Sequence, residues 1–174
     1  MNAADRSIVL IGFMGTGKSS VGRRLAQSRG WPRRDIDAMI ATALGMRITE
    51  IFERLGQDRF RTEESAILEK LDAHEPAIIV TGGGAILRPE NIKRLHELGM
   101  VVCLTADTAT LLERLARRSD RPLLQTVDRA GTVEELLRTR APLYQEAADF
   151  TIDTSGLSHD QVATRIEETI ATLA

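Results

Sequence analysis

The stretch Ile8–Arg24, IVLIGFMGTGKSSVGRR, decides the fold of this chain. Its first four residues are all aliphatic, which predicts a buried strand. The next eight residues, Gly12–Ser19 (GFMGTGKS), fit the pattern G-x-x-x-x-G-K-[ST] of a phosphate-binding P-loop. A helix is expected over about 18–29, because Gly30 supplies a natural helix end. A strand, a glycine-rich loop and a helix in this order predict a nucleoside triphosphate site.

Each part of this loop has a chemical task. Consecutive backbone N–H groups form a concavity that binds anions, and the positive end of the following helix adds to its field. Lys18 is expected to bring a full charge to the β- and γ-phosphates, and the Ser19 hydroxyl is a hard oxygen ligand suited to Mg²⁺. The flanking strand and helix disfavour the alternative, a turn that binds nothing. The nucleotide-binding residues expected in the loop are Gly12, Gly15, Thr16, Gly17, Lys18, Ser19 and Ser20.

The length, composition and net charge of the chain limit the kinds of protein that it can be. The 174 residues, 43% of them hydrophobic, are enough for one domain with its own core, and we expect a single domain over 1–174. A net charge of −2 gives no attraction to nucleic acid or to an anionic membrane. No apolar run reaches the length of a membrane span, and the N-terminus lacks the apolar core of a secretory leader. The single cysteine, Cys103, excludes an intrachain disulfide and fits a reducing compartment. A cytoplasmic location is therefore expected, and we also expect a monomer.

Apolar runs alternate with helical patterns along the whole chain. This alternation predicts an α/β fold with a mostly parallel five-stranded sheet between two layers of helices, as in P-loop NTPases and nucleoside monophosphate kinases. Ligands of such sheets bind at the carboxyl ends of the strands, so residues far apart in sequence should meet at one edge. Strands are expected over about 8–11, 33–36, 77–80, 100–104 and 149–152. Helices are expected over about 18–29, 38–44, 49–55, 58–72, 89–98, 108–117, 133–147 and 158–173.

Two aspartates follow the short second strand. P-loop proteins often orient the metal with an Asp from a later strand end, but here the strand 77–80 ends in Thr81 and glycines. Asp35 is therefore the second candidate, with Ser19, for holding Mg²⁺. Asp37 could accept a hydrogen bond from an acceptor hydroxyl, as a base or as a positioning group. The alternative reading of the pair is a cap for the helix that follows.

Three further groups have the chemistry of an acceptor site, each with a plainer alternative. Arg61 and Glu64 could pair on a helix surface, or Glu64 could orient Arg61 toward an anionic group of the acceptor. Gly82–Gly84 could be a turn, or could let a substrate lie against backbone N–H groups. Arg140 could point inward to the site or carry plain surface charge. Spacing alone leaves these alternatives open.

The polar stretch 119–131 is too long for a plain connection, which favours a mobile functional loop. If this loop closes over the nucleotide, Arg121 would reach the transferring phosphoryl group as an arginine finger in cis.

In these motifs the chain resembles the shikimate kinases, over about residues 8–152. Any one motif is modest support, whereas six in the same order are highly specific. The motifs are GFMGTGKS at Gly12–Ser19, DID at Asp35–Asp37, FRTEE at Phe60–Glu64, TGGG at Thr81–Gly84, RPLL at Arg121–Leu124 and RAPLY at Arg140–Tyr144.

The resemblance implies ATP-dependent phosphorylation of the 3-hydroxyl of shikimate, in aromatic amino-acid biosynthesis, with Mg²⁺. It implies that Lys18 and Arg121 contact phosphates, that Ser19 and Asp35 serve Mg²⁺, and that Arg114 stacks on adenine. Residues 117–129 would be the lid and 38–72 the substrate-binding region. The residues that would hold shikimate are Asp37, Arg61, Gly82, Gly83, Gly84 and Arg140, with both arginines on its carboxylate.

Two departures from the family pattern stand out. Arg33 occupies a position, two before Asp35, where the family usually has an aromatic residue. The segment Ser155–His159 lacks the Arg and Pro that some members place by the adenine. Two other functions stay open: a small P-loop kinase for gluconate or a nucleoside monophosphate, and a kinase-like nucleotide-binding protein without turnover. The first has no need for Asp37, Arg61 and Arg140 together, and against the second every chemically necessary position is filled.

Overall fold

A five-stranded parallel sheet forms the centre of the structure, a computed structural model that describes residues 6–117 and 128–173. The strand order is β2-β3-β1-β4-β5, and every hydrogen-bonded pair of strands is parallel. The sheet thereby confirms the α/β fold that the alternating pattern predicts. The strands are β1 (Ser7–Gly12), β2 (Arg33–Asp35), β3 (Ile78–Val80), β4 (Gly99–Thr105) and β5 (Phe150–Asp153).

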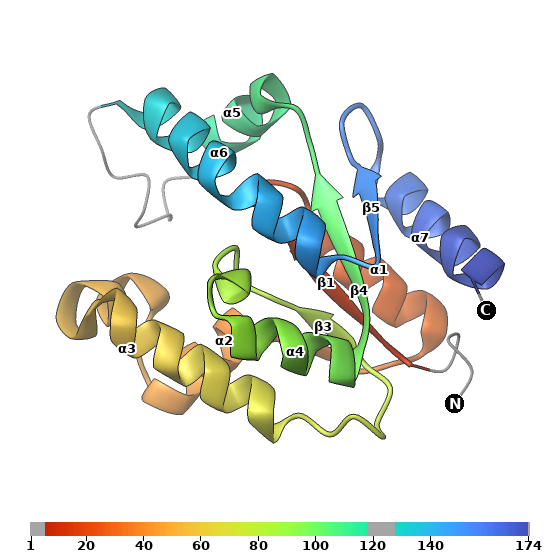
Figure 1. The fold of residues 1–174 in the computed structure, drawn as a ribbon, viewed down its shortest axis with the longest axis horizontal. Coiled ribbons are helices and arrows are strands. Elements are labelled where there is room, and N and C mark those ends of the chain that lie inside the picture. Colours follow the sequence, from red (N-terminus) through yellow and green to blue (C-terminus); the bar gives the residue numbers. More distant parts are fainter. Residues whose placement is uncertain (1–5, 118–127, 174) are drawn as a thin grey trace.

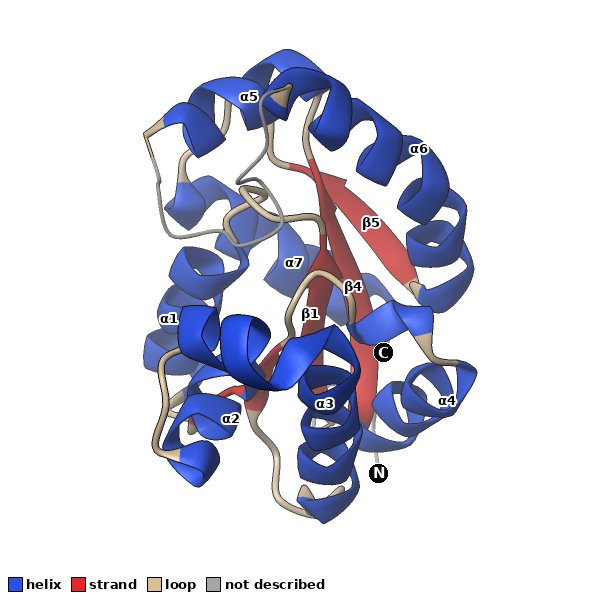
Figure 2. Ribbon diagram, turned by 90° about the vertical axis from the view of Figure 1, so that its left-hand side faces the viewer, coloured by secondary structure: helices blue, strands red, loops and turns tan. Residues whose placement is uncertain are grey.

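Helices cover both faces of the sheet (Figure 1). Figure 2, turned by 90°, shows α1 and α7 on one side of the strands and α4 and α6 on the other. The helices are α1 (Lys18–Arg29), α2 (Ile36–Leu44), α3 (Ile48–Lys70), α4 (Pro89–Leu98), α5 (Thr108–Ala116), α6 (Arg129–Ala147) and α7 (His159–Leu173), with a 3₁₀ helix at Ala85–Leu87.

The two faces of the sheet bury two separate apolar clusters, because side chains alternate along a strand. In β1, Ile8 and Leu10 pack toward α1 and α7, whereas Val9 and Ile11 pack toward α3, α4 and α6. All four residues are at most 1% exposed. The strand that the sequence marks as buried is therefore the one at the middle of the sheet.

Helix bounds differ from the expected ones where capping side chains act. The Asp35 carboxylate accepts a hydrogen bond from the Ala38 N–H (3.3 Å), and α2 accordingly begins at Ile36 rather than at about 38. Asp128 caps α6 in the same way, with 2.9 Å to the Gly131 N–H, and this helix begins at Arg129 rather than at about 133. The two helices expected over 49–55 and 58–72 meet at Gly56, whose φ of 80° interrupts α3.

Within the parts of the chain that the structure describes, no helix combines the length and the apolar character that crossing a membrane requires.

Candidate active site

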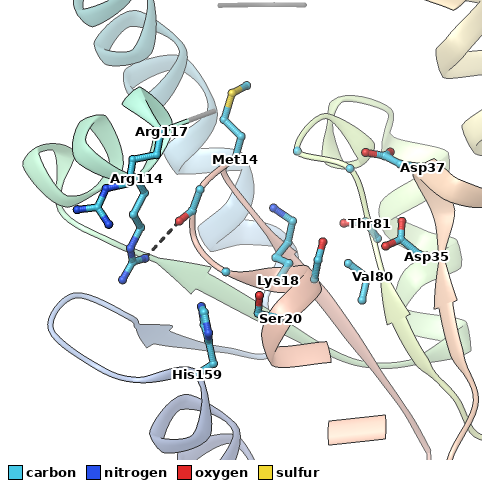
Figure 3. A pocket seen from close by; sticks show the side chains of 15 residues that line it. Met14, Lys18, Ser20, Asp35, Asp37, Val80, Thr81, Arg114, Arg117 and His159 are labelled. Atoms are coloured by element: carbon cyan, nitrogen blue, oxygen red, sulfur yellow. Dashed lines mark hydrogen bonds between the residues drawn. The ribbon is translucent and has the colours of Figure 1, made fainter. Parts of the chain in front are cut away.

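A cavity of about 340 Å³ opens at the carboxyl ends of β1, β2 and β3 (Figure 3). The P-loop contributes Gly15, Gly17 and the first three residues of α1, Lys18–Ser20. Asp35 and Asp37 line the cavity on one side of Lys18, and Arg114, Arg117 and His159 line it on the other. As the sheet topology requires, residues distant in sequence meet at one edge.

The P-loop backbone can close only with glycine at three positions. Gly12, Gly15 and Gly17 have φ values of 136°, 85° and 97°, a region that side chains strongly disfavour. At Gly12 a Cβ would also lie 2.2 Å from the Leu104 carbonyl oxygen of β4. The glycines of the motif are therefore explained by the backbone itself.

Lys18 lies folded over the loop. Its Nζ donates to the carbonyl oxygens of Gly12 (2.7 Å) and Phe13 (2.9 Å), and the residue is only 9% exposed. These bonds hold a positive charge at the cavity floor, where the N-terminus of α1 adds its own positive field. The arrangement suits a bound polyphosphate.

Two residues expected to bind nucleotide do not line this cavity. Gly12 belongs to the end of β1, and Thr16 is 1% exposed, with its hydroxyl donating to the Phe13 carbonyl oxygen (2.8 Å). The structure therefore places Thr16 beneath the loop, where its side chain fixes the loop shape. The remaining expected P-loop residues, Gly15, Gly17, Lys18, Ser19 and Ser20, do line it.

The donor set fits Mg²⁺. Ser19 and Asp35 line the same cavity and offer a hydroxyl and a carboxylate, both hard oxygen ligands. Among the described residues, no group of three or more His, Cys, Asp or Glu side chains could form an all-protein metal cage. Mg²⁺ does not need such a cage, because it keeps several waters and binds one or two protein oxygens together with substrate phosphates. Asp35 also accepts from Arg33 (3.2 Å), the residue that departs from the family pattern.

A second cavity, of about 60 Å³, adjoins the first, and Met14, Asp37, Gly82 and Gly83 line both. Three residues of α3, Ile48, Phe52 and Phe60, form its apolar wall. Its remaining polar lining comes from Arg61, Gly84 and Arg140. A small molecule bound in this second cavity would face the P-loop across Asp37.

Two buried guanidinium groups characterise this second cavity. Arg61 and Arg140 are 7% and 5% exposed, which decides against the surface readings of both. Arg61 donates to Glu64 (2.7 Å), and Arg140 donates to the Gly83 carbonyl oxygen (3.3 Å). Of these two arginines, only Arg61 is ion-paired among the described residues, whereas Arg140 is bonded to a backbone oxygen, so its charge is left for a ligand. Such a cavity favours an anion that can accept planar, forked hydrogen bonds.

Glycines let the charged groups approach the TGGG backbone. A Cβ on Gly84 would lie 2.2 Å from Nη2 of Arg61, and a Cβ on Gly82 would lie 2.6 Å from Oδ1 of Asp37. The same Cβ on Gly82 would lie 3.2 Å from Oε1 of Glu64. A side chain at either position would thus displace the Arg61 guanidinium or the Asp37 carboxylate from its present place.

Glu64 is a fully buried carboxyl group beside the second cavity. It is 0% exposed, and burial raises its pKa to about 7 despite the opposing charge of Arg61. The neighbouring Asp37 carboxylate adds to this rise. Oε1 of Glu64 has no hydrogen-bond partner among the described residues, whereas Oε2 accepts from Arg61. Glu64 therefore changes its charge near neutral pH, next to the anion-binding cavity.

The comparison with protein families adds the decisive observation. The family model described as shikimate kinase matches residues 14–171. The chain belongs to the shikimate kinase family.

Individual relatives agree with this assignment. The shikimate kinase of Thermodesulfovibrio yellowstonii is 46% identical over 161 residues, covering 92% of each chain. The shikimate kinase of Bradyrhizobium diazoefficiens is 45% identical over 97% of this chain and 79% of its own. A solved shikimate kinase from Acinetobacter baumannii, in complex with shikimate, superposes with a TM-score of 0.92 at 37% identity, covering 96% of this chain and 93% of that one. A gluconokinase from Sinorhizobium meliloti is similar in fold alone, with a TM-score of 0.61 at 21% identity.

Within this shikimate kinase fold, several cavity residues are not among those expected to bind a ligand. Met14 lies inside the motif Gly12–Ser19, and Arg117 is the first residue of the expected lid. Thr81 belongs to the TGGG motif, and its hydroxyl donates to the Leu10 carbonyl oxygen (3.0 Å). His159 ends the segment Ser155–His159, where the chain lacks the usual residues of the family, and the return of α7 toward the P-loop brings it to the cavity.

Arg114 lies where the resemblance expects a nucleotide contact. Its guanidinium donates to the Gly15 carbonyl oxygen (3.2 Å), to the Thr154 hydroxyl (3.0 Å) and to the Thr154 carbonyl oxygen (2.9 Å). These bonds fix the group at the rim of the cavity. Arg121 and most of the expected lid, residues 118–127, lie outside the described residues.

Proposed function

We propose that this chain transfers the γ-phosphoryl group of ATP to the 3-hydroxyl of shikimate, giving shikimate 3-phosphate in aromatic amino-acid biosynthesis. The observation that carries the proposal is the pair of buried guanidinium groups, Arg61 and Arg140, in a cavity that Asp37 joins to the P-loop. Such a site suits a small hydroxylated carboxylate. Gluconate and nucleotide acceptors share the P-loop requirement but give no reason for this arrangement.

The donor half of the site consists of the P-loop and the rim beyond it. The proposed nucleotide contacts are the backbone of Gly12–Gly17, the side chains of Lys18 and Ser20, and the face of Arg114 for the adenine. Ser19 and Asp35 would hold Mg²⁺, which when bound supplies positive charge to the phosphates. Lys18 stabilises the charge that develops on the transferring group.

The acceptor half lies across Asp37. Arg61 and Arg140 are proposed to bind the carboxylate of shikimate, while Gly82–Gly84 let its ring lie against the backbone. Asp37 then accepts a hydrogen bond from the 3-hydroxyl and orients it, or takes its proton, as the oxygen attacks the γ-phosphorus.

Residues 38–72 are proposed as the substrate-binding region and 117–129 as the lid, with Arg121 arriving from the lid onto the transferring phosphoryl group. We also propose a single kinase domain over 1–174 that acts as a cytoplasmic monomer, without nucleic-acid or membrane partners. The net charge of −2 supports the absence of a nucleic-acid partner.

An assay that couples ADP release to a spectroscopic signal tests the function. Purified protein with Mg-ATP is given shikimate, quinate, gluconate or a nucleoside monophosphate, and ADP formation is compared with that without acceptor. We expect stimulation by shikimate. Stimulation only by a nucleotide would refute the proposal, and ATP binding without turnover on any acceptor would favour a silent nucleotide-binding protein.

Replacing Arg140 tests the carboxylate site. We expect Arg140→Ala to raise the shikimate KM by about 10- to 100-fold, the range of a lost charged hydrogen bond, with a smaller effect on the ATP KM. Arg138→Ala is the matched control on the same helix, because the Arg138 side chain is 73% exposed and pairs with nearby Glu135. An unchanged shikimate KM in Arg140→Ala would contradict the role of Arg140.

The raised pKa of Glu64 predicts a pH dependence of shikimate binding. Below pH about 7 Glu64 is neutral, so the charge of Arg61 is fully available to the anionic substrate. Above it the Glu64 carboxylate competes for Arg61, and the shikimate KM should therefore rise several-fold between pH 6 and pH 8. Steady-state kinetics across this range measure the effect.

Glu64→Gln should flatten this pH profile, because the amide does not titrate. Glu63→Gln is the control, since Glu63 lies next in the chain and pairs with the exposed Arg59 (2.7 Å). If Glu64→Gln kept the wild-type profile, the titrating group would lie elsewhere.

A further inference from the structure

Gly83 lies where the two cavities of the site meet and lines both of them. Its backbone also lies against the P-loop, since a Cβ on Gly83 would be 3.6 Å from the Gly12 carbonyl oxygen and 3.6 Å from the Met14 nitrogen. A displacement of Gly83 would therefore change the nucleotide side and the acceptor side of the site together. The groups that hold this peptide in place thus matter to both sides.

Two side chains of α6 donate hydrogen bonds to the Gly83 carbonyl oxygen. One donor is the Tyr144 hydroxyl, and the other is Nη1 of Arg140, at 3.3 Å. The two residues are four apart in the helix, so they lie on the same face, and one carbonyl oxygen has lone pairs for both donors. Helix α6 thus reaches the TGGG segment, Thr81–Gly84, through this backbone oxygen.

The two donors differ in their access to a ligand. Arg140 lines the second cavity, whereas Tyr144 is not among the residues that line either of the two cavities. Tyr144 is 5% exposed, and burial raises the pKa of its hydroxyl well above the ordinary value, with the charges of Arg140 and Arg61 opposing the rise in part. The hydroxyl therefore stays protonated and donates over the whole physiological pH range. Tyr144 is thus a constant donor to Gly83 that a ligand in these cavities does not contact.

Arg140 meets a different demand when an anion enters the second cavity. Its bond to Gly83 is long, and a carboxylate attracts the guanidinium more strongly than a neutral carbonyl oxygen does. If Arg140 were the only donor, its departure would leave without a partner a carbonyl oxygen that faces two buried side chains, which is costly. With the Tyr144 hydroxyl in place the oxygen keeps a donor, so Arg140 can turn to the ligand at little cost.

We propose that Tyr144 is a positioning residue for the acceptor: its hydroxyl holds the Gly83 carbonyl oxygen and thereby frees the Arg140 guanidinium for the carboxylate of the substrate. The inference rests on the proposed function, which supplies that carboxylate. It goes beyond that function by assigning a task to a residue that does not contact the ligand. Because Tyr144 contributes through Arg140, its effect on acceptor binding should disappear where Arg140 is absent.

Tyr144→Phe removes the hydroxyl and keeps the ring with its packing. Calorimetry on the full chain measures the dissociation constants of shikimate and of ADP with Mg²⁺. We expect shikimate binding to weaken on the order of tenfold, as for the loss of one buried hydrogen bond, and ADP binding to stay as in the wild type. Thr139→Val is the matched control, because it removes an exposed hydroxyl of the same helix that donates locally, to the carbonyl oxygens of Glu135 (3.0 Å) and Leu136 (3.2 Å).

A double-mutant cycle separates this role from a purely structural one. We expect Arg140→Ala and the double variant Arg140→Ala/Tyr144→Phe to bind shikimate equally, because the Gly83 oxygen of the double variant lacks both of these donors with or without the ligand. A structural role of the hydroxyl would instead weaken binding by the same factor in both backgrounds. Steady-state kinetics give a second readout, since Tyr144→Phe should raise the shikimate KM and leave the ATP KM unchanged. Thermal unfolding checks that each variant is folded.

Two outcomes would overturn the inference. A shikimate affinity of Tyr144→Phe equal to that of Thr139→Val would show that the hydroxyl has no part in acceptor binding, and equal factors in the two backgrounds would show that it acts independently of Arg140. Failure of the proposed function looks different. A wild-type chain that binds shikimate without phosphorylating it would reject the function, while the cycle would still decide the role of Tyr144. A wild-type chain that does not bind shikimate would reject both.

Discussion

Lys18→Met should abolish turnover with shikimate, lowering kcat by at least about 10²- to 10³-fold, the typical loss when one group that stabilises transition-state charge is removed. Methionine keeps the length and most of the apolar stem of lysine but removes the charge. In the structure this charge lies at the floor of the cavity, 2.7 Å from the Gly12 carbonyl oxygen and 2.9 Å from that of Phe13. The initial rate of ADP release at saturating ATP and shikimate measures the loss.

Because Lys18 also fixes the loop, its variant needs two controls. Lys93→Met makes the same chemical change on α4, where the Lys93 side chain is 83% exposed, and should keep wild-type kinetics. Thermal unfolding of Lys18→Met separates a lost charge from a lost fold. A folded Lys18→Met enzyme with wild-type kcat would show that the P-loop lysine has no part in the transfer.

Asp37→Asn should lose turnover while ATP still binds. General acid–base catalysis contributes about 10²- to 10⁴-fold, and an amide of the same shape cannot accept the proton of the acceptor hydroxyl. Asp37 lines both cavities, so its carboxylate lies at the junction of donor and acceptor. The steady-state rate of ADP release gives kcat, and calorimetry with Mg-ADP gives the nucleotide affinity of the same preparation.

The neighbouring helix offers a matched control for this change. Asp58→Asn alters an exposed carboxylate of α3 and should leave both kcat and nucleotide affinity unchanged. An active Asp37→Asn enzyme would refute the assigned role of Asp37. A variant that lost ATP binding together with turnover would instead place Asp37 among the nucleotide contacts.

The sheet could be predicted because its strands carry their own signal. The aliphatic run at Ile8–Ile11 and the glycines after it dictate a buried strand and a P-loop without reference to the rest of the chain. Bounds set by single side chains were less accessible. The early start of α2 depends on the Asp35 carboxylate reaching the Ala38 N–H, and the 3₁₀ helix Ala85–Leu87 follows a run of glycines that has no periodicity.

The site could be predicted only as far as its motifs reach. The position of Arg140 in the middle of a helix does not say which side it faces, because that depends on what packs against α6. In the structure the hydroxyl of Tyr144, one turn further on, donates to the same Gly83 carbonyl oxygen that accepts from Arg140. His159 was beyond reach, since its approach to Gly17 arises from the path of the chain after β5.

The short strand β2 has a consequence for how the protein behaves in concentrated solution. It is an edge strand of the sheet. An edge strand exposes backbone N–H and C=O groups that can pair with a strand of a second polypeptide. Here that edge strand is three residues long, and both Arg33 and Arg34 are exposed. Because this edge strand is short and charged, a strand of a second molecule can form few hydrogen bonds with it. We therefore expect these two arginines to oppose self-association of the molecule into aggregates.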